Sequence, residues 1–469
     1  MNKIKMILSL GCIGSLLEGA APAQSPVTIT LTGATTPGFE VPADFTGLSF
    51  ETQSLLPDVD GKYLFGPANR PLITLFQTLG IKILRVGGNT ADRPGVPVPG
   101  PADIDSLFAF ARAADVKVIY TLRLRNGSAT NAATTAQYIA QRYQPQLACF
   151  AIGNEPNFYF KTYVAYHDEW IKYAAAIKTE VPDAEFCGPS AGGYPVWSHD
   201  FANDFGKSEP IAFIAQHDYP CGNGMLATDI AAAQDKMLAP QLQDEYRSMW
   251  RSFVPAALSN GVPFRFEEAN SFYNAGARDV SDTFASALWG LDFLHWWAAH
   301  DASGVNFHTG DKVAAGSANR SCWYATFWSS DRGYDVHPIG YAIKAFNLGG
   351  HGRVEPLTLS NPDGVNLTAY AIRDGRSLFI TLINKGHGAG AKAAQVTLAA
   401  PDISKNAAVI FLSAPDNNPA AKTGVTLGGA SITDNGWEGK WTPLAPDQTG
   451  QCTINMPATS AAILKLPLK

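Results

Sequence analysis

From Phe45 to Asn347 the sequence alternates short apolar runs with segments of helical periodicity. This alternation is typical of βα repeats that build a parallel sheet. We place eight strands at residues 45–50, 81–87, 116–123, 147–153, 184–188, 211–217, 262–268 and 303–308. We place amphipathic helices between them, for example at residues 104–113, 165–179 and 241–258, and a last helix at 339–347. The pattern predicts an α/β fold, a (β/α)8 TIM barrel whose functional side chains lie at the C-terminal ends of the strands.

After Gly349-Gly350 the apolar residues recur with a period of two, and turns interrupt them. Residues 366–372 and 377–383 flank Asp374-Gly375, which predicts a β-hairpin. Further strands are expected at residues 395–398, 408–413 and 461–466. Because 469 residues exceed the size at which a single core stops growing, two domains are expected. We predict a barrel at 45–347 and a β-sandwich at 348–469, with residues 24–44 adding an edge strand at 27–31.

The first 23 residues have the pattern of a secretory signal peptide. Lys3 and Lys5 precede an apolar run at residues 6–17, and Ala21-Pro22-Ala23 matches a cleavage site with small residues. The apolar run is too short to cross a bilayer, and no later run is long enough. We therefore predict a secreted or periplasmic protein without a membrane span.

Five cysteines remain after the predicted cleavage. Cys149 and Cys187 lie in apolar runs and are expected to be buried small hydrophobic residues. Cys221 and Cys322 lie in predicted loops, where one disulfide is possible. Because no Cys/His cluster has the spacing of a zinc site, we expect no metal. We also expect no other cofactor.

Two of the predicted strands end on carboxylates. The apolar run at residues 149–152 stops at Gly153-Asn154-Glu155, and the run at 262–266 stops at Glu267-Glu268. In barrel order Glu155 ends the fourth strand and Glu268 the seventh, so both lie at the C-terminal face. Two carboxylates placed in this way suit glycoside hydrolysis, in which one protonates the leaving oxygen and the other attacks or activates water. The alternative is that Asn154 and Glu155 only open a loop.

The segments around these carboxylates resemble glycoside hydrolase family 79, the β-glucuronidase and heparanase-like enzymes of the large retaining (β/α)8 clan A. Gly153-Asn154-Glu155-Pro156-Asn157 looks like the acid/base signature of that clan, and residues 268–276, EANSFYNAG, look like the nucleophile segment of the family. The resemblance runs from about Phe45 to the C-terminus. It implies that Glu155 is the acid/base and Glu268 the nucleophile. Glu267 is the fallback, since neighbouring residues on a strand point to opposite sides.

The resemblance also implies residues that bind the sugar. Asp92 would hold the glycone hydroxyls, unless it is a solvated loop carboxylate, and Asn154 would bond the 2-hydroxyl. The hydroxyl of Tyr219 would contact the nucleophile. Glu51 is a further candidate for substrate binding.

Two more polar residues lie in predicted strands. Arg85 interrupts an apolar strand, where a charge needs a partner, and Glu268 is the expected one. His217 precedes Tyr219 at the end of the sixth strand. A core histidine with satisfied hydrogen bonds explains it at least as well as a role in the site does.

In the family, a tyrosine and the backbone amides of a glycine-rich turn receive the uronate carboxylate. Tyr273 fits this tyrosine, but Asn274 and Ala275 replace glycines and would narrow the turn while keeping the amide donors. A second tyrosine after the eighth strand is expected to share this role, with Tyr324 the choice and Tyr334 the alternative. A group of aromatic residues is expected either to stack on sugar rings or to belong to the core: Trp323, Phe327 and Trp328.

Together these features predict a retaining exo-β-glucuronidase that acts on terminal β-linked glucuronic acid of a glycan or glycoside through a covalent glycosyl-enzyme intermediate. An endo-acting heparanase-like enzyme is less favoured, since a sulfated polymer calls for Lys/Arg-rich walls, and Lys+Arg number 35 against 41 Asp+Glu. The net charge of −6 also gives no sign of the basic surface that binds nucleic acid. Another retaining clan A β-glycosidase is a further alternative. A sugar-binding or scaffolding protein would explain the fold but not two intact carboxylate motifs.

Overall fold

The computed structural model describes residues 26–32, 38–193, 195–399, 406–448 and 450–468. The predicted signal peptide at residues 1–23 lies outside the described residues. None of the described helices is both long enough and apolar enough to cross a membrane.

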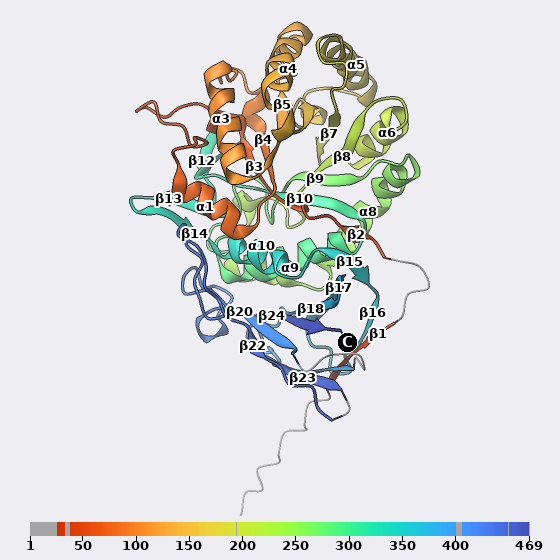
Figure 1. Cartoon of the computed structure of the whole chain (residues 1–469), viewed down its shortest axis with the longest axis vertical. Coiled ribbons are helices and arrows are strands. Elements are labelled where there is room, and N and C mark those ends of the chain that lie inside the picture. The colour runs from red at the N-terminus through yellow and green to blue at the C-terminus, as the bar shows by residue number, and fades with distance from the viewer. Residues whose placement is uncertain (1–25, 33–37, 194, 400–405, 449, 469) are drawn as a thin grey trace, which may run out of the picture.

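Eight parallel strands close into a barrel in the described part of the chain, in the order β10-β3-β4-β5-β6-β7-β8-β9 (Figure 1). They are β3 (Thr46–Glu51), β4 (Ile83–Gly87), β5 (Lys117–Leu122), β6 (Leu147–Ile152), β7 (Phe186–Gly192), β8 (Ile211–Asp218), β9 (Phe264–Ala269) and β10 (Ala302–His308). Strands such as β3, β4 and β9 are buried along their whole length, as expected for a parallel sheet covered by helices. The predicted fold class is confirmed.

Helices lie between the barrel strands. They are α1 (Arg70–Leu79), α2 (Asn89–Asp92), α3 (Pro101–Ala114), α4 (Ala129–Tyr143), α5 (Tyr163–Glu180), α6 (Pro195–Phe205), α7 (Ile230–Leu238), α8 (Leu242–Ser259), α9 (Phe284–Ala298) and α10 (Pro338–Asn347). Helix α1 shows why such segments form: Leu72, Leu75, Phe76 and Leu79 recur on one face and are buried. Gly80, with φ of 82°, then ends the helix in the left-handed conformation.

Two antiparallel-rich sheets form the C-terminal sandwich (Figure 1). One has the order β16-β1-β19-β23, from β16 (Leu357–Ser360), β1 (Val27–Leu31), β19 (Ala394–Ala399) and β23 (Gln451–Met456). The other has the order β2-β15-β17-β18-β24-β20-β21, from β2 (Glu40–Val41), β15 (Gly352–Glu355), β17 (Leu367–Asp374), β18 (Ser377–Asn384), β24 (Ser460–Pro467), β20 (Ala408–Ser413) and β21 (Thr426–Leu427), with β22 (Thr442–Pro443) beside β20. The predicted hairpin is β17–β18. The predicted edge position of β1 is wrong, because β16 pairs along its outer side.

Strand β18 shows how the sandwich is fixed to the barrel. Leu378, Ile380 and Leu382 point into the core between the two sheets, whereas Phe379 and Ile383 belong to the core shared with the barrel helices. This is the period-two pattern of a strand buried on both faces. Helix α9 lies between barrel and sheet and is buried at every position, so its sequence has no polar face.

Two short hairpins separate β10 from α10. They are β11 (Lys312–Ala315) with β12 (Ala318–Ser321), and β13 (Phe327–Ser330) with β14 (Gly333–Val336). The first hairpin reaches the C-terminal face of the barrel, where Ala314, Gly316 and Ser317 line the cavity described below.

Candidate active site

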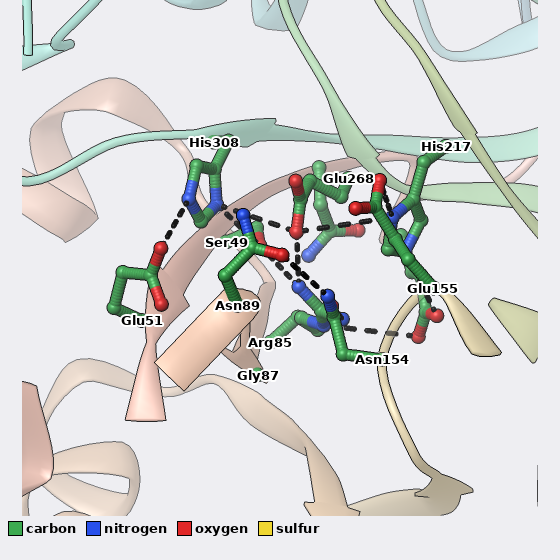
Figure 2. A network of polar contacts seen from close by, with 12 residues as sticks. Ser49, Glu51, Arg85, Gly87, Asn89, Asn154, Glu155, His217, Glu268 and His308 are labelled. Carbon is green, nitrogen blue, oxygen red and sulfur yellow. Dashed lines mark hydrogen bonds and ion pairs between the residues drawn. The ribbon is translucent and has the colours of Figure 1, made fainter. Parts of the chain in front are cut away.

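Glu155 and Glu268 face the same cavity at the C-terminal ends of β6 and β9 (Figure 2). The cavity has a volume of about 680 Å³. One carboxylate oxygen of Glu155 lies within 4.8 Å of one of Glu268, and His217 lies within the same distance of both. The structure therefore brings together the two carboxylates that the sequence singles out.

The backbone at Glu155 turns sharply as it leaves β6. Glu155 has φ of 46°, a left-handed conformation that is uncommon for a residue with a side chain, and its N–H donates to the carbonyl of Ser190 at 2.9 Å. Gly192 on β7 leaves the space for its carboxylate, because a Cβ there would lie 2.3 Å from Oε1 of Glu155. Strain of this kind persists only where the surroundings fix it, and it is common at functional sites.

Glu268 accepts a hydrogen bond on each oxygen. The Tyr219 hydroxyl donates to Oε1 at 2.7 Å, and Nη1 of Arg85 donates to Oε2 at 2.6 Å. Burial raises the pKa of Glu268, but His308, His217 and Arg85 together outweigh burial and hold it well below its usual range. Glu268 is therefore an ionised carboxylate, the form that attacks an anomeric carbon.

Arg85 is fully buried and joins the two halves of the site. Besides Glu268 it contacts Ser49, and its Nη2 donates to Oδ1 of Asn154 at 2.7 Å. Gly87 makes room for it, since a Cβ there would lie 2.3 Å from the guanidinium carbon. The expected pairing of Arg85 with Glu268 is present.

Glu267 points away from the cavity and is fully buried. Its Oε1 lies 3.3 Å from Nε2 of His217, and its Oε2 lies 3.9 Å from Nε of Arg85. On the other side of the ring, Nδ1 of His217 lies 3.2 Å from Oε1 of Glu155. Burial lowers the pKa of His217, but the surrounding carboxylates Glu268, Glu155 and Glu267 raise it to about 9. Burial raises the pKa of Glu267, and Arg85 and His217 bring it below its ordinary value.

His217 is therefore more than a satisfied core histidine. The sequence signal for it was its position two residues before Tyr219 at a strand end. That signal was ambiguous, because the same position suits a packed core residue.

Asp92 lines the cavity, but its carboxylate is occupied by the protein. Oδ1 accepts from the backbone N–H groups of Leu124 and Arg125, and Oδ2 accepts from the N–H of Asn154 and the hydroxyl of Tyr159. Burial raises its pKa above the ordinary value. Asp92 thus orders the loops that carry Asn154. Its predicted contact with the sugar stays a prediction.

Glu51 lies behind the cavity wall. Its Oε2 accepts from the N–H and hydroxyl of Thr90, and its Oε1 accepts from the N–H of Ala314 and lies 3.6 Å from Nε2 of His308. Gly88, with φ of 63°, is required there, because a Cβ would lie 2.6 Å from the Glu51 carboxylate.

His308 itself lines the cavity, with Nδ1 3.7 Å from Oε2 of Glu268, and sequence analysis did not identify it.

The turn after β9 has three consecutive residues with positive φ: Asn274 at 60°, Ala275 at 74° and Gly276 at 84°. Tyr273 and Asn274 line the cavity, and Tyr273 is 43% exposed. Among the described residues, the backbone N–H groups of Asn274 and Ala275 find no protein acceptor. The two replacements for glycine are therefore accommodated in a left-handed turn that leaves both amides unused.

The two candidate tyrosines after the eighth strand lie in different surroundings. Tyr324 lines the cavity, with its ring 5.9 Å from that of Tyr219. The hydroxyl of Tyr334 accepts from Asn69 instead and borders a different hollow. Neither Trp323, Phe327 nor Trp328 lines the cavity, so of the two explanations for these aromatic residues the structure favours packing.

The cysteines are all free in the described part of the chain, so the possible Cys221–Cys322 disulfide is not formed. Cys221 packs in the main core and Cys322 in a small separate cluster beside Tyr324.

Glu155, His217 and Glu268 are close enough together to be considered as a cation site. The charges around them oppose that interpretation. The Arg85 guanidinium already donates to Oε2 of Glu268, and the surrounding carboxylates raise the pKa of His217 to about 9, which favours the imidazolium. A second cation would be placed against two positive groups.

Comparisons with known proteins support the same family as the sequence motifs. Residues 369–463 match the glycosyl hydrolase family 79 C-terminal beta domain. A beta-glucuronidase of Aspergillus niger is 26% identical over 297 residues, which are 52% of this chain and 54% of that protein. The match thus spans about half the length of this relative. The resemblance to glycoside hydrolase family 79 is confirmed.

Solved structures with a similar fold include a glucuronidase and an arabinofuranosidase. A 4-O-alpha-L-rhamnosyl-beta-D-glucuronidase from Fusarium oxysporum 12S superposes with a TM-score of 0.75 at 16% identity, over 94% of this chain and all of that one. The GH51 arabinofuranosidase from Xanthomonas axonopodis pv. citri gives 0.69 at 14% identity, over 94% and 99%. These likenesses show the fold. The match to the family 79 C-terminal domain and the similarity to a beta-glucuronidase also agree with the prediction of a glycoside hydrolase.

Proposed function

We propose that this chain is an exported, retaining exo-β-glucuronidase. The observation that carries the proposal is the approach of Glu155 and Glu268 to within 4.8 Å between carboxylate oxygens. Retaining glycosidases hold their carboxyl groups about 5 to 5.5 Å apart, whereas inverting enzymes need about 6.5 to 9.5 Å to admit a water.

The geometry suits a double displacement. Glu268, ionised and held by Tyr219 and Arg85, attacks the anomeric carbon, while Glu155 gives its proton to the departing oxygen. The product of this step is a glycosyl ester on Glu268 and a free aglycone. Glu155, now a carboxylate, removes a proton from water, and the resulting hydroxide equivalent displaces Glu268 from the sugar. Asn154, whose Oδ1 accepts from Arg85, would bond the 2-hydroxyl.

The turn after β9 supports a uronate as the sugar. The N–H groups of Asn274 and Ala275 have no acceptor among the described residues, and Tyr273, Asn274 and Tyr324 line the cavity. A carboxylate at C5 would satisfy these donors without an arginine. Tyr324 packs in a small buried apolar cluster with Ala275, Val313, Ala315, Cys322 and Ala325, and this packing beside the expected uronate position supports exo action.

The simplest test compares matched aryl β-glycosides. We expect release of nitrophenol from the β-glucuronide and much slower release from the β-glucoside and β-galactoside. The first product seen by NMR should be β-glucuronic acid. An α-anomer as first product would exclude retention, and equal rates on all three substrates would exclude a uronate site. Cleavage inside a glucuronic-acid oligosaccharide would exclude exo action.

A second test assigns the two carboxylates. Glu268→Gln should abolish turnover for every leaving group. Glu155→Ala should still react once with an activated aryl glucuronide and then stall, so mass spectrometry should find one glucuronyl unit on the peptide that contains Glu268. Fragmentation that places the label on Glu267 would overturn the assignment.

Export rests on residues 1–23 alone. Expression of the full chain in a secreting host, followed by N-terminal sequencing, should show cleavage after Ala23. Retention of the intact N-terminus inside the cell would contradict this part of the proposal.

A further inference from the structure

The buried pair Glu267 and His217 is not used by the reaction described above. His217 lies between two carboxylates, with Nε2 3.3 Å from Oε1 of Glu267 and Nδ1 3.2 Å from Oε1 of Glu155. Neutral imidazole has one N–H and cannot donate to both. The imidazolium donates to both, so the geometry favours a histidine that carries two protons.

We propose that Glu267 and His217 form a positioning dyad for the acid/base: Glu267 holds His217 as an imidazolium whose Nδ1–H occupies Oε1 of Glu155, which leaves Oε2 as the oxygen that carries and returns the catalytic proton. This inference rests on the proposed function, because it assigns Glu155 the acid/base role. Glu267 never touches the substrate, since it is fully buried and lies outside the cavity lining.

The groups packed around the dyad balance its charge. From β4, Arg85 faces Glu267 with its Nε at 3.9 Å, and from β7, Cys187 donates to Oε2 of Glu267 at 3.6 Å. On the cavity side Nδ1 of His217 lies 3.9 Å from Oε2 of Glu268. The remaining neighbours of Glu268 are Tyr219 on the loop after β8 and His308 on β10. In the free enzyme, the Arg85 guanidinium and the His217 imidazolium thus oppose the carboxylates of Glu267 and Glu268.

The dyad should matter most in the second half of the reaction. When Glu268 becomes an ester, its negative charge is lost, while Glu155 must stay ionised to accept the proton of water. The imidazolium beside Oε1 stabilises that carboxylate. Without it Glu155 would hold its proton more tightly, and hydrolysis of the intermediate would slow at neutral and mildly acidic pH.

The test uses Glu267→Gln in the full-length enzyme with a dinitrophenyl β-glucuronide, for which hydrolysis of the intermediate limits kcat. We expect the acidic limb of the kcat profile to move to higher pH by about one unit, the size of effect of one nearby charge. Glu267→Asp, which keeps the charge, should restore part of the shift. Asp292→Asn is the matched control, because Asp292 is also a buried carboxylate with a cationic partner but lies outside the site. It should lower stability without moving the profile.

A measurement independent of turnover separates this inference from the proposed function. Histidine-selective NMR should show His217 doubly protonated at pH 7 in the wild type and titrating at lower pH in Glu267→Gln. If no β-glucuronide is hydrolysed, the proposed function fails while the NMR result still decides the charge state of the dyad. A neutral His217 at pH 7 overturns the inference, as does a Glu267→Gln profile that is lower but unshifted.

Discussion

At the scale of single residues, the site depends on buried charges that hold the reacting groups. Arg85 contacts the nucleophile and Asn154, and His217 contacts the acid/base. The sequence identified the charge of Arg85 as one that needed a partner. It left the role of His217 open, because only the folded barrel places its ring between Glu155 and Glu267.

Tyr273 should decide selectivity for the uronate. Tyr273→Phe removes one hydroxyl that would donate to the carboxylate, a hydrogen bond to a charged group worth about 1.5 to 3 kcal/mol. We expect kcat/KM to fall roughly 10- to 100-fold on an aryl β-glucuronide and little on any residual β-glucoside activity. Tyr334→Phe is the control, since Tyr334 bonds Asn69 beside another hollow. Equal losses on both substrates would remove Tyr273 from carboxylate recognition.

His217 should also make stability depend on pH. Its pKa in the folded state is about 9, above the ordinary 6.5, because the nearby carboxylates outweigh burial. The folded state therefore binds this proton more tightly than the unfolded state does. This stabilisation is fully present below pH 6.5 and is lost as pH rises towards 9. Chemical denaturation should show the free energy of unfolding falling across this window, and the fall should shrink in Glu267→Gln. An unchanged slope in the variant would contradict the coupling.

At the scale of elements, the barrel strands fall within a few residues of their predicted positions, because each is a short apolar run bounded by turn residues. The two hairpins after β10 were not predicted. Their strands have only four residues each, and β12 is exposed at every position. An apolar alternation over so few residues is too short to predict a strand. One of them nonetheless supplies Ala314 to the cavity and to Glu51.

The turn after β9 offers a test of strain. Ala275 is buried at φ of 74°, and a left-handed conformation costs a non-glycine residue about 1 to 2 kcal/mol. Ala275→Gly relieves this strain, but it also loses the burial of one methyl group and gives the unfolded chain more freedom, each worth about 0.5 to 1 kcal/mol. These effects should roughly cancel, so the free energy of unfolding should change little. Ala277→Gly, equally buried but without positive φ, should lose about 1 to 2 kcal/mol in urea unfolding. Equal losses in the two variants would show that the turn is unstrained.

At the scale of the whole molecule, the barrel and the sandwich meet at a buried polar cluster on α9. Asp292 accepts from Nζ of Lys385 at 2.7 Å and from the hydroxyls of Thr368 and Tyr370 at 2.7 and 2.8 Å. Burial raises the pKa of Asp292, but Lys385 and the hydroxyls bring it below the ordinary value. Sequence analysis predicted the two domains but not this contact, because Asp292 and Lys385 are distant in the chain.

Breaking this contact should destabilise the protein strongly. Lys385→Met leaves the Asp292 carboxylate buried without its cation, which typically costs about 3 to 5 kcal/mol. Replacing both partners, with Asp292→Leu and Lys385→Met, removes the uncompensated charge and should recover most of the loss. Lys172→Met, at the exposed pair with Glu169, is the control and should change the free energy of unfolding little, because solvent screens an exposed ion pair. Denaturant titrations followed by both tryptophan fluorescence and far-UV circular dichroism would check these values. If the contact joins the two domains into one cooperative unit, the fluorescence and circular dichroism transitions should coincide in the wild type and separate in Lys385→Met. If Lys385→Met loses no more free energy of unfolding than the control does, the sandwich is held on the barrel by apolar packing alone.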